Sequence, residues 1–154
     1  MATRAFDSPL GRLVLDAEGE ALTGVRWAAQ GEKPRTEGKS AVLAEAARQL
    51  DRYFAHRLKR FDLGIRPAGS PFQQGVWTAT RSIPWGRTGT YGGIAMVLSS
   101  GPRAVGTACG RNPMMIVTPC HRVLAKGGAI GGYSGGQGLV AKRRLLALEG
   151  IDVD

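Results

Sequence analysis

The stretch TYGGIAMVLSSGPRAVGTACGRNP, residues 90–113, decides the fold of the second half of the chain. Thr90 can cap a short helix that runs past Ile94, and Ser99–Pro102 favours a turn. Residues 103–110 then predict a second short helix with small side chains. Two short helices joined by a tight turn are typical of a helix-turn-helix unit, although ordinary helix packing also favours small residues.

Upstream of this stretch, the patterns predict an α/β region. Residues 8–28 alternate short apolar runs with glycine-containing turns, which predicts a β-hairpin or meander. Ser40 can cap a helix over residues 41–56, where apolar residues recur at helical spacing. Residues 61–65 alternate again and predict another strand. The segment PAGSP, residues 67–71, then marks a boundary before a mainly helical remainder.

The helical remainder is expected to begin and end with well-marked helices. Ser-Pro at 70–71 combines a good N-cap with a proline suited to the first helical position. Residues 139–150 predict the last helix, with Leu145, Leu146 and Leu148 facing inward and basic residues on its outer face.

The charge distribution favours a polyanionic partner. The chain has a formal net charge of +9, and no acidic residue lies between Asp62 and Glu149. A long basic segment without acids suits a nucleic-acid backbone, although a role in solubility would give the same composition. The basic residues of the segment are Arg66, Arg81, Arg87, Arg103, Arg111, Arg122, Lys126, Lys142, Arg143 and Arg144.

Composition excludes several classes of protein. Hydrophobic residues make up 43% of the chain, which supports a packed core. Two cysteines (109 and 120) and two histidines (56 and 121) are too few for a disulfide scaffold and lack the paired spacing of a zinc site. No apolar run approaches the roughly 20 residues that span a bilayer. We therefore expect no metal, no cofactor, no membrane partner and a cytoplasmic location, close to the nucleoid if the source is bacterial.

The segment Pro119-Cys120-His121-Arg122 carries the most chemical information. A thiol attacks only as thiolate, which a nearby imidazole and a positive charge promote. Neighbouring residues on an extended chain point in opposite directions, so adjacency alone does not establish contact. Taken by itself, the segment favours a buried and inert cysteine over a nucleophile.

The surrounding motifs occur in a known order. TYGGIA, RAVGTACGRNP, VTPCHRV, GGYSGG and LLALEG follow one another between Pro71 and Gly150, with FQQGVW and IPWG at the start. This region resembles the O6-alkylguanine-DNA alkyltransferase (methylated-DNA–protein-cysteine methyltransferase) family, and the N-terminal part agrees more loosely through SPLGRLVL. The resemblance implies a ribonuclease-H-like α/β domain over residues 1–66. It implies a mainly α domain with a winged helix-turn-helix-like DNA-binding unit over residues 67–154.

The resemblance also implies five catalytic residues. Cys120 would accept the alkyl group, and His121 would act as its base through a bridging water. Glu149 would orient the imidazole, in the nucleophile–base–orienter arrangement of a triad. Asn112 would brace the active-site turn, and Tyr91 would help rotate the nucleotide and donate a proton to the leaving guanine.

Further residues would contact DNA and the extruded base. Arg103 would fill the gap that the base leaves in the duplex. Cys109, by contrast, is expected to be a structural residue packed on its short helix. The expected DNA-binding residues are Arg103, Ala104, Gly106, Thr107 and Tyr91, and the expected base-pocket residues are Tyr133, Ser134 and Met114.

The implied activity is direct reversal of DNA damage. Duplex DNA bound through its minor groove would present a flipped O6-alkylguanine, and transfer to Cys120 would be irreversible, so each molecule would act once. O4-alkylthymine as a second substrate and cooperative binding of a monomeric protein remain open. The alternatives are a non-enzymatic damage sensor, against which Cys120 argues, and a cysteine hydrolase. Departures from the family pattern at Thr118, Arg87 and Gly75 bear on substrate range, DNA affinity and stability rather than on the reaction.

Overall fold

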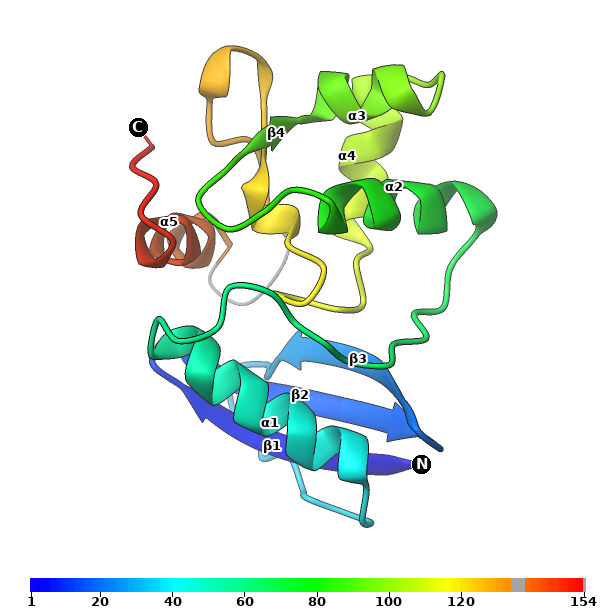
Figure 1. Cartoon of the computed structure of the whole chain (residues 1–154), viewed down its shortest axis with the longest axis vertical. Coiled ribbons are helices and arrows are strands. Elements are labelled where there is room, and N and C mark those ends of the chain that lie inside the picture. The colour runs from blue at the N-terminus through cyan, green and yellow to red at the C-terminus, as the bar shows by residue number, and fades with distance from the viewer. Residues whose placement is uncertain (134–137, 154) are drawn as a thin grey trace. The chain divides into compact units, whose positions relative to one another are not determined.

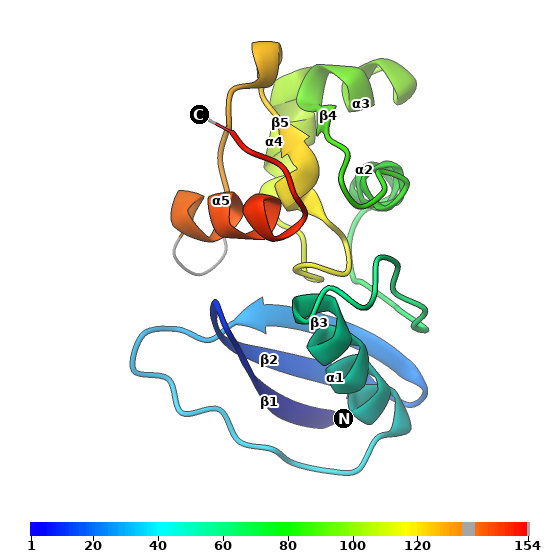
Figure 2. The same ribbon diagram turned by 60° about the vertical axis from the view of Figure 1, so that its left-hand side comes forward.

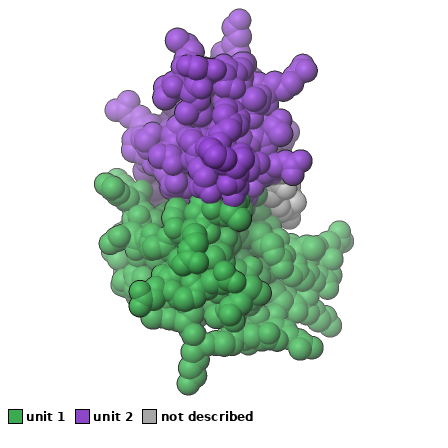
Figure 3. Space-filling view, turned by 90° about the vertical axis from the view of Figure 1, so that its right-hand side faces the viewer, with its two compact units in different colours: residues 1–68, 113–115 green, residues 69–112, 116–154 purple. Residues whose placement is uncertain are grey.

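A computed structural model describes residues 1–133 and 138–153, so Ser134 lies outside the described residues. The chain separates into two compact units, Met1–Ala68 with Pro113–Met115 and Gly69–Asn112 with Ile116–Asp154 (Figure 3). No helix in the described part is long and apolar enough to cross a membrane. The expected division into independent domains at residues 66 and 67 stays a prediction.

The first unit is a three-stranded antiparallel sheet covered by one helix. Strands β1 (Ala2–Ser8), β2 (Gly11–Glu18) and β3 (Ala21–Trp27) follow one another as a meander. Helix α1 (Ala41–Phe54) lies across one face of the sheet and packs against all three strands (Figures 1 and 2). Its apolar face closes a core with the sheet, which includes the buried side chains Leu13, Leu15, Leu22, Leu43, Leu50 and Tyr53.

The meander and the capped helix confirm the sequence predictions, but the strand predicted over residues 61–65 is wrong. The segment pairs with β3 at one point, where Leu22 N–H donates to the Gly64 carbonyl and Arg66 N–H donates to the Leu22 carbonyl. A single bridge forms no ladder, so alternation of apolar residues here reflects packing rather than strand pairing. The edge of β3 also receives Pro113–Met115, through hydrogen bonds that join Val25 to the Pro113 carbonyl and the Met115 N–H.

The second unit is built mainly from helices. They are α2 (Pro71–Arg81), α3 (Tyr91–Val97), α4 (Pro102–Gly110) and α5 (Leu139–Leu148), with the 3₁₀ turns η1 (Cys120–Arg122) and η2 (Lys126–Gly128). A short parallel pair, β4 (Gly89–Thr90) with β5 (Val123–Leu124), ties the chain before α3 to the chain after η1.

Local sequence explains where these helices begin. Ser70 and Gln73 form a reciprocal capping box at α2, and Thr90 accepts a hydrogen bond from the Gly93 N–H at α3. Helices α3 and α4 pack on one another as the sequence predicts for a helix-turn-helix unit (Figure 1). Beneath them, the Trp77 indole donates to the Ala108 carbonyl at 2.9 Å, which fixes α2 against α4.

Helix α5 corrects one sequence interpretation. Leu145 and Leu146 are buried as expected, and Leu148 is half-buried. Lys142, however, is completely buried rather than part of the basic outer face. It lies three, four and seven residues before Leu145, Leu146 and Glu149, so it shares their face of the helix.

Candidate active site

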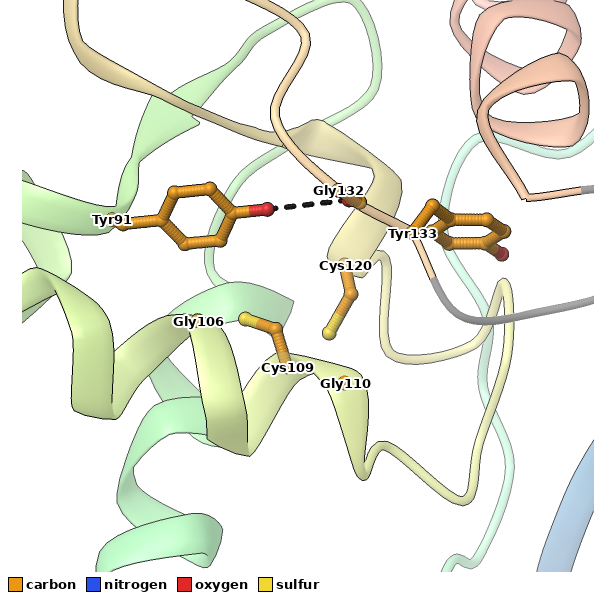
Figure 4. A pocket seen from close by; sticks show the side chains of 7 residues that line it. All are labelled: Tyr91, Gly106, Cys109, Gly110, Cys120, Gly132 and Tyr133. Carbon is orange, nitrogen blue, oxygen red and sulfur yellow. Dashed lines mark hydrogen bonds between the residues drawn. The ribbon is translucent and has the colours of Figure 1, made fainter.

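Cys120 lies at the base of a small cavity in the second unit. It opens the turn η1 directly after Pro119, and its side chain is 5% exposed. The cavity has a volume of about 300 Å³. Cys120 projects into it from η1, Cys109 projects from α4, and the Tyr91 hydroxyl points across it toward Gly132 (Figure 4). The described residues that line it are Tyr91, Gly106, Cys109, Gly110, Cys120, Gly132 and Tyr133.

On the other side of η1, His121 and Glu149 form a completely buried pair. His121 Nε2 lies 2.7 Å from Glu149 Oε2. His121 Nδ1 has no hydrogen-bond partner within residues 1–133 and 138–153. Glu149 therefore holds Nε2 of the imidazole ring, and Nδ1 is left to accept or donate a proton.

Electrostatics fix the protonation states of this pair. Burial lowers the pKa of His121, although Glu149 acts in the opposite direction. Burial raises the pKa of Glu149, but hydrogen bonds and charge from His121 and Arg122 outweigh it and lower the value to about 2. An ionised carboxylate can only accept, so His121 Nε2 carries the proton and donates it to Glu149. The lone pair then resides on Nδ1, where a base needs it.

Arg122 completes the network from the third position of η1. Its Nε donates to Glu149 Oε1 at 2.7 Å, one Nη donates to Oε2 at 3.1 Å, and the other Nη donates to the Ile83 carbonyl at 2.6 Å. The sequence suggested Arg122 as a source of positive potential beside the thiol and as part of a DNA-facing basic stretch. The structure corrects the second role, because this guanidinium is buried and neutralised by Glu149.

Asn112, at the end of α4, connects that helix to the active-site turn. Its side-chain amide donates to the Thr118 carbonyl at 2.9 Å. Cys109 and burial raise the pKa of the Cys120 thiol, and Asn112 opposes this rise through a hydrogen bond. The Thr118 hydroxyl, in turn, accepts from Arg81 at 3.0 Å. The threonine that departs from the family pattern is thus buried with its hydroxyl satisfied.

Tyr91 begins α3 and reaches the same cavity from the opposite side. Its hydroxyl donates to the Gly132 carbonyl at 3.3 Å, and burial raises its pKa. Lys142 Nζ lies 3.5 Å from that hydroxyl and donates to the carbonyls of Val123 and Gly132 at 2.7 and 3.0 Å. Burial lowers the pKa of Lys142 to about 8. Sequence reasoning missed this lysine, which holds β5, the glycine-rich segment and the tyrosine together.

Cys109 is the second residue that the sequence placed outside the site. It is buried on the inner face of α4, as expected, but that face opens into the cavity beside Cys120. The hydrogen bond between the two thiols is the largest influence on both: it lowers the pKa of Cys109 and raises that of Cys120. The two therefore ionise as a pair, in which the first proton leaves more easily than the second.

A larger groove of about 750 Å³ lies beside the cavity and shares Tyr91 and Gly106 with it. Arg103 and Thr107 line it from the exposed face of α4, and Lys126 lines it from η2. Ala104 is exposed on the same helix. The groove therefore brings four of the five expected DNA-binding residues to one place, with Ala104 next to them.

Met114 is the clear exception among the expected site residues. It is completely buried, it does not line the cavity, and it belongs to the first unit, where it bridges to Val25 of β3. The sheet edge needs a backbone partner at this point, and pairing there directs the methionine into the first core. Tyr133 does line the cavity, as expected.

Comparisons with known proteins establish the family. The 6-O-methylguanine DNA methyltransferase DNA binding domain matches residues 71–151, and the ribonuclease-like domain of the same enzymes matches residues 1–67. The chain belongs to the 6-O-methylguanine DNA methyltransferase family. This membership confirms the resemblance that the motifs indicated and the α/β-then-helical fold expected from it.

Relatives of the family match almost the whole chain. The methylated-DNA–protein-cysteine methyltransferase of Mycobacterium leprae is 42% identical over 95% of this chain and 90% of its own length. That of Methanosarcina acetivorans is 43% identical over 94% and 96%. The crystal structure of Mycobacterium tuberculosis O6-methylguanine methyltransferase superposes with a TM-score of 0.85 at 41% identity, covering 97% of this chain and 93% of that one. A structure of the tuberculosis protein in complex with DNA superposes with a TM-score of 0.84 at 41% identity, covering 96% and 92%.

Proposed function

We propose that this protein repairs DNA by moving the alkyl group of O6-alkylguanine onto its own Cys120. One observation carries the assignment. Cys120 is the cavity thiol that directly precedes a buried histidine, and Glu149 holds that histidine as a neutral base. Cys109 has no such neighbour in the sequence.

The residues suggest how the reaction proceeds. His121 Nδ1 takes the thiol proton through a bridging water, and the hydrogen bond from Asn112 stabilises the resulting thiolate. The sulfur attacks the sp³ carbon, a C–S bond forms, and the bond between that carbon and guanine O6 breaks. Tyr91 supplies a proton to the leaving base. The product thioether has no simple hydrolytic route back, so one protein molecule repairs one lesion.

Binding of duplex DNA has a separate structural basis. The small residues on the exposed face of α4 allow close approach to a minor groove. Among the described residues, the lining of the 750 Å³ groove includes Arg103 and Lys126 but no acidic residue. Extrusion of a base costs a few kcal/mol of stacking and pairing, which Arg103 offsets by occupying the gap. Because phosphate contacts dominate, affinity depends strongly on salt and weakly on sequence. We propose that the protein acts as a monomer.

A free-base substrate tests the assignment without requiring DNA. The protein is incubated with O6-benzylguanine and its intact mass is followed with time. We expect one benzyl adduct per chain, absent in Cys120→Ser and retained in the matched variant Cys109→Ser. An adduct that survives Cys120→Ser would contradict the assignment. DNA binding without any adduct would favour the damage sensor, and many product molecules per chain would favour a hydrolase.

The same assay on oligonucleotides sets the substrate range. Duplexes that carry O6-methylguanine or O4-methylthymine are compared at equal protein concentration. We expect the guanine lesion to react, and the thymine duplex shows whether the cavity also accepts a pyrimidine. Sedimentation of the free and DNA-bound protein tests the monomeric state.

A further inference from the structure

The acceptor thiol shares its cavity with a second thiol. Cys109 and Cys120 come from α4 and η1, and their sulfur atoms project into the space between these elements (Figure 4). Both line the same cavity, and both are cysteines in the free form. They are also the chain's only cysteines, so any intramolecular disulfide must join these two.

The surroundings favour reaction of the pair with a small oxidant. The cavity admits a molecule much larger than a peroxide, since its volume is about 300 Å³. The positive charge of Lys142 favours ionisation of both thiols, and the Cys109 thiolate is further stabilised by Thr80. The first of the two ionisations supplies one nucleophilic thiolate. The second sulfur lies beside it and can react with the sulfenic acid that the thiolate forms.

We propose that Cys109 protects the acceptor by forming a reversible disulfide with Cys120 when a peroxide oxidises one of the two thiols before an alkylated base arrives. One thiolate attacks the peroxide, the O–O bond breaks, and a sulfenic acid forms as hydroxide leaves and is protonated to water. The second thiol attacks that sulfenic sulfur, an S–S bond forms, and the hydroxyl leaves as water. Two thiols are oxidised and one peroxide is reduced to two waters.

The disulfide protects a residue that the protein uses only once. Sulfenic acid that is not resolved proceeds to sulfinic acid, which ordinary thiols do not reduce. A disulfide blocks alkyl transfer for a time, but a dithiol restores it. An S–S bond is about 2 Å long, so the two cysteine side chains must move together before it forms.

Mass spectrometry tests the proposal independently of alkyl transfer. Wild-type protein, Cys109→Ser and Cys109→Val are treated with increasing hydrogen peroxide, and free thiols are then blocked with N-ethylmaleimide. We expect wild-type protein to lose about 2 Da, to take up no maleimide and to give a peptide that joins residues 109 and 120. In both variants Cys120 should instead gain about 32 Da as the sulfinic acid.

Activity recovery provides the second readout. Each oxidised protein is treated with dithiothreitol, and its benzyl acceptance is divided by that of its own unoxidised sample. Wild-type protein should recover most of its activity, and both variants should recover at least about tenfold less. Sulfinic Cys120 beside a maleimide-labelled Cys109 in wild-type protein would overturn the proposal, as would disulfide-linked dimers on a non-reducing gel. If the disulfide forms but the unoxidised protein never accepts a benzyl group, this proposal stands and the proposed alkyl transfer to Cys120 fails instead.

Discussion

Two pairs of basic residues in the second unit have opposite surroundings. Arg122 and Lys142 are buried, and their charges meet a carboxylate and backbone carbonyls. Arg103 and Lys126 are exposed and line the 750 Å³ groove. Residues of the same type, from one acid-free stretch, thus serve two purposes: the buried pair organises the site, and the exposed pair is available to phosphates.

This difference limits what a count of charges can predict. Two of the ten basic residues in the acid-free stretch are interior, so the potential offered to DNA is smaller than the composition indicates. The acid-free stretch ends at Glu149, the carboxylate that pairs with the buried Arg122. Substitutions in the buried pair should therefore affect protein stability and alkyl transfer. Substitutions in the exposed pair should affect only the binding and repair of duplex DNA.

Loss of the buried guanidinium should have the largest effect. Arg122→Met removes three donors and leaves the buried Glu149 carboxylate without its cationic partner. It should lower the free energy of unfolding by about 3–5 kcal/mol. Urea denaturation measures the change. Arg144→Met, at an exposed position of α5, is the matched control and should stay within about 0.5 kcal/mol. Equal effects of the two substitutions would remove the distinction between buried and exposed cations.

Acid should weaken the same network. The pKa of Glu149 is about 2 in the folded protein against an ordinary 4.5, so its contribution is complete above pH 4.5 and is lost as the pH falls toward 2. This shift corresponds to about 3 kcal/mol. Urea denaturation between pH 2 and 6 should show a steeper loss for wild-type protein than for Glu149→Gln. Asp152→Asn, at an exposed acid, should follow the wild-type curve, and parallel curves for all three proteins would contradict the network.

The buried lysine should have an intermediate effect. Lys142→Met takes the ammonium donor from the Val123 carbonyl and leaves the Gly132 carbonyl with the Tyr91 hydroxyl alone, which should cost about 1–3 kcal/mol of unfolding free energy. Because the same ammonium lies 3.5 Å from the Tyr91 hydroxyl, benzyl acceptance should also slow. Arg143→Met is the neighbouring exposed control. Unchanged stability and an unchanged rate in Lys142→Met would show that this lysine is only incidental to the site.

The exposed arginine should have the smallest effect on the protein itself. Arg103→Ala should leave stability and benzyl transfer from the free base nearly unchanged, because Arg103 is exposed and is not one of the residues that line the cavity. Repair of O6-methylguanine in duplex DNA should slow by about tenfold or more, since extrusion of the base loses its support. Single-turnover rates on the two substrates make the comparison, and equal losses on both would refute a role in extrusion.

Much of this arrangement could be predicted from local sequence. The caps Ser40, Ser70 and Thr90 start helices where short-range hydrogen bonding dictates, and all three were predicted. The motifs around Cys120 and the isolated acid Glu149 predicted that Glu149 would hold the His121 imidazole, and the 2.7 Å contact between the two side chains agrees. These features depend on residues close together in sequence or on patterns already known for the family.

What could not be predicted depends on packing between distant segments. The burial of Lys142 had a signal in its helical spacing with Leu145 and Glu149, but its partners come from β5 and the glycine-rich segment. Met114 entered the first core because β3 offered an unpaired edge. Cys109 was expected to be a structural residue packed on its helix, yet it also lines the cavity. Each of these three features depends on which element packs against the residue. The spacing of apolar residues along the chain does not specify that element.

The central claim is that Cys120 accepts one alkyl group from DNA. A duplex with O6-methylguanine labelled in its methyl group is mixed with excess protein, and the label is located by digestion. We predict one label per lesion on the peptide that contains Cys120, unmodified guanine left in the duplex, and no transfer by Cys120→Ser. Label on Cys109, label released to solvent, or repeated turnover by one protein molecule would contradict the account.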